Sequence, residues 1–213
     1  MSEKSPKFEA SIKESILSEQ AVSLASEYSE IALDSILQDG ILKDIPVINT
    51  IIGISKASIA IRDRLLIKKI VQSLAGLNDV SSEKRIQMIN RLEQDTKFSQ
   101  SVGEHILEIL ERVESHRKPI IIARVFAAYA KKEIDTVTLL RLNSAIERLP
   151  SFEIENLRPF HNRSKEAPFL ADESTTIIAF LGAGFAFAGS GVGGTWHNAT
   201  DLCKVFIKLG LDL

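Results

Sequence analysis

One segment near the C-terminus of this chain has no charged side chain. From Ser174 to Thr200 the sequence lacks Asp, Glu, Lys and Arg, although charged residues make up 25% of the whole chain. Apolar surface of this length is unfavourable in water, so the segment must pack inside the protein, against a partner or in lipid. Its structure therefore decides between a globular protein and one that enters a membrane.

Two stretches are apolar enough to be compared with a membrane span, which needs about 20 sustained apolar residues. The uncharged segment is long enough, but Gly189–Gly194 interrupts it, and glycine destabilises helices. The stretch Ile45–Ile61 is shorter and contains Lys56. The first residues lack the apolar core of a signal peptide, and the single cysteine, Cys203, fits a reducing compartment. We therefore expect a globular, cytoplasmic protein.

The first two thirds of the chain have the apolar spacing of helices. The helices expected there cover residues 11–37, 45–74, 84–93, 98–113, 120–131 and 139–149, and a short helix over 152–157 follows them. Gly40 and Gly76 are placed to end the first two helices. The helix over residues 45–74 is apolar nearly all round, which is typical of a central helix. The sequence thus predicts a mainly α fold with an N-terminal helical bundle over residues 1–134.

After Pro150 the pattern changes. We expect an irregular loop over residues 159–168, a helix that ends near Leu181, and a β-hairpin with strands over residues 183–188 and 195–198. The glycine-rich residues 189–194 would form its loop, with Phe187 and Trp196 facing the core. A closing helix over residues 202–209 would be capped by Asn198 or Thr200.

This order of elements resembles a winged-helix module over about residues 135–213. The resemblance implies an α+β fold and raises DNA binding, because in that family the third helix and the wing contact DNA through Arg, Lys or polar side chains. Here the matching helix begins with Asp172-Glu173, and neither it nor the wing contains Arg or Lys. We therefore expect the module to bind protein rather than nucleic acid.

Basic residues are not in excess, since the net charge is −2. That balance gives no general electrostatic affinity for nucleic acid. The nearest group of basic side chains that could contact nucleic acid or a partner is Arg158, His161, Arg163 and Lys165.

The expected helix over residues 45–74 is apolar in its first half and basic in its second. It could be the centre of the bundle, or it could insert at an anionic bilayer with its basic side chains at the headgroups. The residues that would contact a membrane or a partner are Ile51, Ile52, Gly53, Ile54, Arg62, Arg64, Lys68 and Lys69.

Catalytic signatures are missing from the sequence. The glycines are followed by no Gly-Lys-Ser/Thr and do not open a helix after a strand, as phosphate-binding loops do. The four histidines are scattered, whereas a zinc site needs three or four ligands that converge. No Gly-x-Ser-x-Gly nucleophile motif occurs. We expect no catalytic residue, no metal and no cofactor.

These observations favour a non-enzymatic interaction or regulatory protein that binds a protein partner or a second copy of itself. One alternative is a conditional membrane-active effector of the toxin or phage-defence type, which would expose Ile45–Ile61 or Ile177–Val192. A second alternative is a DNA-binding regulator.

Overall fold

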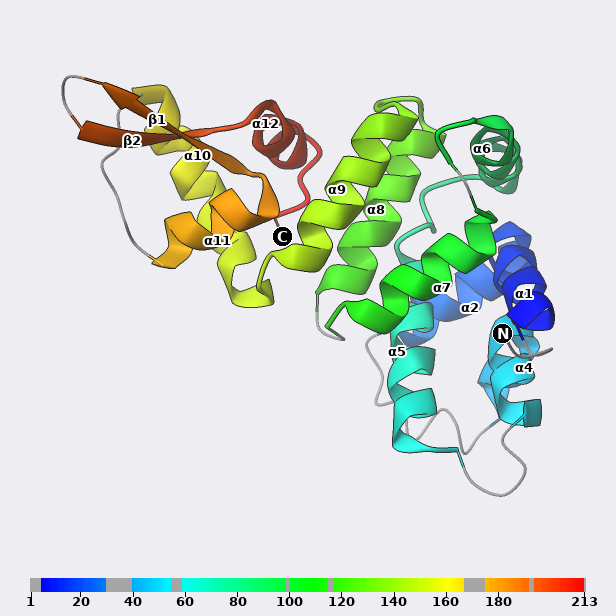
Figure 1. Ribbon diagram of the computed structural model, residues 1–213. Helices are drawn as coiled ribbons and strands as arrows, with labels where there is room; N and C mark the ends of the chain where they lie inside the picture. The colour runs from blue at the N-terminus through cyan, green and yellow to red at the C-terminus, as the bar shows by residue number, and fades with distance from the viewer. Residues whose placement is uncertain are drawn as a thin grey trace. The chain divides into compact units, whose positions relative to one another are not determined.

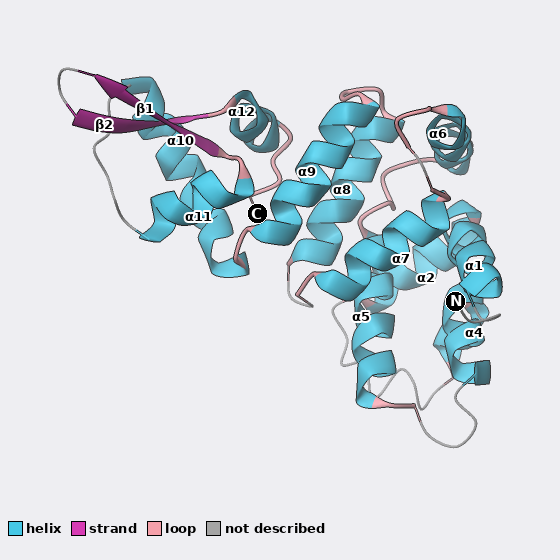
Figure 2. Ribbon diagram, in the orientation of Figure 1, coloured by secondary structure: helices cyan, strands magenta, loops and turns pink. Residues whose placement is uncertain are grey.

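The mainly α fold with one β-hairpin is confirmed by a computed structural model of the chain (Figure 1). The structure describes residues 5–29, 40–54, 59–98, 100–114, 117–166, 175–191 and 194–212. Figure 2 shows that helices make up most of the fold and that the two strands lie near its C-terminal end. Internal packing divides the chain into unit 1, residues 1–136, and unit 2, residues 137–213.

Unit 1 is a bundle of helices. Its described elements are α1 (Ser5–Leu17), α2 (Glu19–Tyr28), η1 (Ile41–Asp44), α4 (Pro46–Ile54), α5 (Ile61–Ala75), α6 (Ser82–Gln94), α7 (Val102–Arg112) and α8 (Lys118–Ala130). Helix α1 packs on α4 and α7, and α5 packs on α2 and α8. Nearly every residue of α8 is buried. The central helix of the bundle is therefore α8, which carries more small and apolar residues than its neighbours.

The prediction of one helix over residues 11–37 was wrong. Two helices, α1 and α2, meet at Ser18, which has an extended backbone and accepts a hydrogen bond from the Ala21 N–H at 3.1 Å. Serine is a favourable N-cap, so the chain begins a new helix there instead of continuing the first. The end of the predicted helix, residues 30–37, lies outside the described residues.

The prediction of one helix over residues 45–74 was also wrong, since α4 ends at Ile54 and α5 begins at Ile61. Ala60, just before α5, has an extended backbone with ψ of 155°. The β-branched isoleucines and Gly53 are poorer helix formers than the unbranched residues of α5. Lys56 lies outside the described residues.

Helices α1 and α7 approach each other closely at Gly103. A Cβ atom built on Gly103 would lie 2.4 Å from the carbonyl oxygen of Glu9, which belongs to the backbone of α1. Backbone cannot move aside as a flexible side chain can. Only glycine therefore allows this packing of α7 on α1.

Unit 2 joins helices to the hairpin. Its described elements are α9 (Thr136–Arg148), η2 (Ser151–Asn156), α10 (Leu157–Glu166), α11 (Thr175–Ala183), β1 (Ala186–Gly191), β2 (Gly194–Ala199) and α12 (Asp201–Lys208). Helix α10 packs on η2, α12 and β2. Thr200 caps α12, because its hydroxyl accepts a hydrogen bond from the Cys203 N–H at 3.2 Å. The aromatic core includes Phe185 and Phe206, whose ring centroids are 5.0 Å apart.

Helix α10 replaces most of the irregular loop predicted over residues 159–168. Pro159, which suggested the loop, lies in the first turn of α10. The N–H groups of a first turn have no partner within the helix, so the missing N–H of proline costs little there. Residues 167 and 168 lie outside the described residues.

Strand β1 lies three residues further along the chain than predicted, and β2 is longer than predicted. Its antiparallel pairs run from Ala186↔Ala199 to Gly191↔Gly194, so the expected loop residues 189–191 and 194 belong to the strands. Glycine-rich composition suggested a loop, but Gly189 has a different role. A Cβ atom on Gly189 would lie 2.1 Å from Cζ2 of Trp196, its cross-strand partner. The glycine therefore makes room for the indole ring within the hairpin.

The expectation that Phe187 and Trp196 face the core was wrong as well. Phe187 is 44% exposed, whereas Ala186, Ala199 and His197 on the other face are buried. Phe185 is fully buried, but it precedes β1 rather than lying within it. The prediction assumed that Phe185 belongs to the strand. Because the strand begins at Ala186, three residues later than predicted, the buried position of Phe185 does not fix the face on which Phe187 lies.

Candidate functional site

The outward face of the hairpin carries two aromatic side chains. The rings of Phe187 and Trp196 pack edge to face, with centroids 5.7 Å apart and an angle of 81°. Trp196 also covers Gly189 across the strand pair. We call the surface formed by Phe187, Gly189, Trp196 and Asn198 the aromatic face.

The aromatic face has a composition typical of protein interfaces. None of its four residues is charged, and Trp196 is only partly buried. Tyr, Trp and Phe are enriched at the centres of interfaces, where charged residues are depleted. An edge-to-face pair also holds its rings in a defined orientation, so less side-chain entropy is lost on binding.

Two other large apolar side chains of unit 2 are exposed. They are Phe152 on η2 and Ile178 on α11, two elements that contact each other. The Thr176 hydroxyl of α11 donates a hydrogen bond to the Glu153 carboxylate of η2 at 3.2 Å. Phe152 and Ile178 therefore lie on two elements, η2 and α11, that this hydrogen bond holds together.

The predicted basic contact residues differ in exposure where their side chains are described. All four lie on α10, but His161 is only 6% exposed. The guanidinium of Arg158 donates to both carboxylate oxygens of Asp212 at 2.5 and 2.6 Å, and these hydrogen bonds raise the pKa of Arg158. Arg163 is exposed, while the side chain of Lys165 lies outside what the structure describes. The charge of Arg158 is thus compensated by Asp212, and His161 is inaccessible to a partner.

The predicted membrane-contact residues lie on α4 and α5 and differ in exposure. Ile51 is buried and Ile52 is half-buried, whereas Gly53 and Ile54 are exposed. Of the basic residues on α5, those exposed are Arg62, Arg64 and Lys68, while Lys69 is half-buried. Ile51 therefore belongs to the core of unit 1.

The list of predicted contact residues omitted the two most exposed apolar residues described in this region. Ile61 is 79% exposed and Leu65 is 47% exposed. Their spacing of four residues, with Arg62 and Arg64 between them, would have placed them on one outer face of a helix. We call Ile54, Ile61 and Leu65 the apolar tip. Figure 1 shows the end of α4 and the start of α5 on the same side of unit 1.

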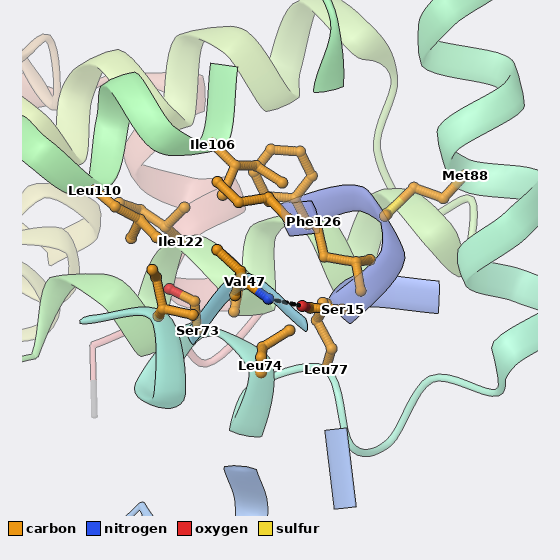
Figure 3. Close-up of a pocket in the computed structure, with 14 residues that line it drawn as sticks. Ser15, Val47, Ser73, Leu74, Leu77, Met88, Ile106, Leu110, Ile122 and Phe126 are labelled. Atoms are coloured by element: carbon orange, nitrogen blue, oxygen red, sulfur yellow. Dashed lines mark hydrogen bonds between the residues drawn. The ribbon is translucent and has the colours of Figure 1, made fainter. Parts of the chain in front are cut away.

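Unit 1 contains a small apolar cavity (Figure 3). Its volume is about 30 Å³, and its walls come from α1, α4, α5, α6, α7 and α8. The Ser15 hydroxyl donates to the Ser11 carbonyl and accepts from the Val47 N–H, and the Ser73 hydroxyl donates to the Pro119 carbonyl. Ligand sites usually enclose roughly 300 Å³ or more. This cavity is therefore a packing gap, too small for a cofactor.

The described titratable side chains include neither a metal-binding group nor an activated thiol. Within the described ranges, no three His, Cys, Asp or Glu residues lie close enough to hold a metal. His105 packs edge to face against Phe98, and burial lowers the pKa of its imidazole. Cys203 is buried, and burial raises the pKa of its thiol to about 12. That thiol stays protonated at neutral pH and is a poor nucleophile.

Comparisons with known proteins gave no match among family models, curated proteins or solved structures. In the part of the chain that the structure describes, no helix has the length and apolar character needed to cross a bilayer. The physical character of the surfaces is therefore the basis for any functional assignment.

Proposed function

We propose that this protein is a non-enzymatic interaction protein whose unit 2 binds a protein through the aromatic face. The observation that carries the proposal is the partly exposed, uncharged Phe187–Trp196 pair on a hairpin whose other face buries Ala186, His197 and Ala199. A hairpin that served only as scaffold would place its large aromatic side chains in the core and polar ones in water. Here the small Ala186 and Ala199 are buried instead.

Binding to protein explains unit 2 better than binding to DNA. The order of three helices, a hairpin and a closing helix supports the resemblance to a winged-helix module. Helix α11, which takes the position of the recognition helix, contains neither Arg nor Lys, and β1 and β2 contain none either. Phosphate contacts in duplex complexes come mainly from such side chains. Unit 2 is therefore better suited to bind a protein than to bind DNA.

A photo-crosslinking residue, p-benzoylphenylalanine, placed at Phe187 tests this proposal in cells that express the full chain. We expect a discrete covalent adduct heavier than the monomer, because the aromatic face is covered by another polypeptide. The matched control carries the same residue at Ile86, an exposed apolar position on α6 in unit 1. The proposal fails if position 187 gives no discrete adduct, or only the adducts that position 86 gives.

A second candidate function is supported by the apolar tip. Ile61 and Leu65 are exposed beside the basic side chains of Arg62, Arg64 and Lys68. Arg62 also forms an exposed ion pair with Glu111 at 3.1 Å, which contributes little in water. Apolar side chains flanked by Lys and Arg are typical of surfaces that bind anionic membranes without crossing them. On this proposal the protein acts at a membrane surface.

Flotation with lipid vesicles tests this second function. We expect the protein to float with vesicles that contain anionic phosphatidylserine and to stay behind with neutral phosphatidylcholine vesicles. The double variant Ile61→Glu/Leu65→Glu should lower the bound fraction at least about tenfold, since it removes two apolar side chains that would insert. Ile86→Glu is the matched control and should bind normally. Equal behaviour of wild type and double variant would contradict the membrane function.

A further inference from the structure

Strand β1 has one edge that is not used within the hairpin. The Thr200 N–H donates to the Phe185 carbonyl, whereas the Ala199 N–H donates to the Ser164 hydroxyl on α10. The pair Ala186↔Ala199 is therefore not hydrogen-bonded across the hairpin. Because such pairs alternate along an antiparallel ladder, the backbone groups of Ala188 and Ser190 also point away from β2.

This edge is exposed at its centre. Ala188 and Ser190 are both exposed, while α10 and α12 pack on β2. Natural edge strands usually carry a lysine, a proline or a bulge that prevents pairing with another strand. Strand β1 has the sequence Ala-Phe-Ala-Gly-Ser-Gly and pairs with β2 in continuous register. It therefore lacks the features that keep a strand edge unpaired.

From this edge we propose that the protein forms a symmetric dimer in which β1 pairs antiparallel with β1 of a second copy, centred on Ala188. This inference rests on the proposed function and names the partner of the aromatic face. A two-fold axis at Ala188 pairs Ala188 with Ala188 of the second copy, and Ala186 with Ser190. The backbone groups of Ala186, Ala188 and Ser190, which point away from β2, then face those of the second copy.

The side chains of β1 fit this register. Phe187 of each copy lies opposite Gly189 of the other in a pair without ladder hydrogen bonds, where side chains approach most closely. Each Gly189 already accommodates the indole of Trp196 within its own chain, because it has no Cβ. The second copy would thus place its Phe187 ring against the indole that already covers this glycine. Large residues face glycine, and small residues face small residues.

The absence of charge permits a second copy as the partner. Neither β1 nor the aromatic face carries a charged side chain, so two identical strands meet without like-charge repulsion. A charged partner would form no ion pair with these uncharged residues. A single pair of short strands buries less than the roughly 1,200 Å² of a stable interface, so the dimer should form at high protein concentration.

Disulfide trapping of the full chain tests the register directly. In the proposed dimer, the Cα atoms of the two Ala188 residues lie about 5.5 Å apart, within disulfide range. Purified Ala188→Cys protein should therefore give a covalent dimer on mild oxidation. The matched control, Ser190→Cys, should not, because its two Cα atoms would be about 14 to 15 Å apart. The native Cys203 is buried and does not interfere.

Sedimentation analysis with an edge-blocked variant gives an independent measurement. Proline at position 188 removes an N–H that is not used within the hairpin, so Ala188→Pro should keep its helical circular dichroism yet remain monomeric. Wild-type protein should shift toward the dimer mass as concentration rises. Wild type that stays monomeric, or Ser190→Cys that crosslinks in preference to Ala188→Cys, would overturn the proposed dimer. If position 187 still crosslinks to another protein in cells, only the dimer is refuted and the proposed function stands.

Discussion

Phe185→Asp is expected to unfold unit 2, whereas Phe187→Asp should leave it folded. Phe185 is fully buried and packs edge to face on Phe206. An aspartate there would place an unpaired charge in an apolar core, which costs about 3 to 5 kcal/mol. That cost is comparable to the whole stability of a small domain. Thermal melts followed by circular dichroism, with limited proteolysis to locate the cleaved unit, measure the effect.

Phe187→Asp is the matched control, because it introduces the same charge two residues further along the chain. Phe187 is partly exposed, so the new carboxylate reaches water. The loss is limited to the contact with Trp196, which is worth about 0.5 to 1.5 kcal/mol. Equal melting temperatures for the two variants would contradict the placement of Phe185 in the core and of Phe187 at the surface.

Gly103→Val should destabilise unit 1 by about 3 kcal/mol or more. The valine Cβ would collide with the carbonyl oxygen of Glu9, so α1 and α7 would have to separate. Neither backbone can relax without breaking helical hydrogen bonds. Denaturant unfolding of the full chain should show the transition of unit 1 at a lower midpoint, with proteolytic fragments identifying the unit that opens.

Gly53→Ala is a control at a glycine where an added Cβ atom would meet no neighbouring atom. Gly53 lies in α4 and has no atom within 4 Å of the position that a Cβ would take. Alanine there should raise stability by up to about 1 kcal/mol, because glycine is the poorer helix former. A similar loss of stability in Gly103→Val and Gly53→Ala would show that the close approach at Gly103 does not limit the packing of α1 on α7.

Local signals in the sequence predicted individual helices well. The helices over residues 120–131 and 139–149 appear as α8 and α9, and Thr200 caps α12 as expected. These features depend on neighbouring residues, so spacing and capping rules apply to them directly. The breaks at Ser18 and after Ile54 were missed, because apolar periodicity continues through them. A continuous apolar pattern does not require a continuous helix.

The candidate site was harder to predict because it depends on where β1 begins. Strand β1 begins three residues later than predicted, and the glycines around Ser190 gave no sign that they belong to it. The surroundings of the basic residues on α10 could not be predicted for a related reason. Arg158 is neutralised by Asp212, a residue far away in the sequence, which no local pattern reveals. Partners that come together only in the folded chain cannot be inferred from spacing.

The position of Trp196 gives the protein a built-in optical probe. It is the only tryptophan in the chain, and it lies in unit 2, whereas both tyrosines, Tyr28 and Tyr129, lie in unit 1. Fluorescence excited selectively in the indole therefore reports the hairpin alone. The partly exposed ring should emit at shorter wavelength when another polypeptide covers it. The folding of unit 2 and the occupation of its aromatic face can thus be followed in the unlabelled protein.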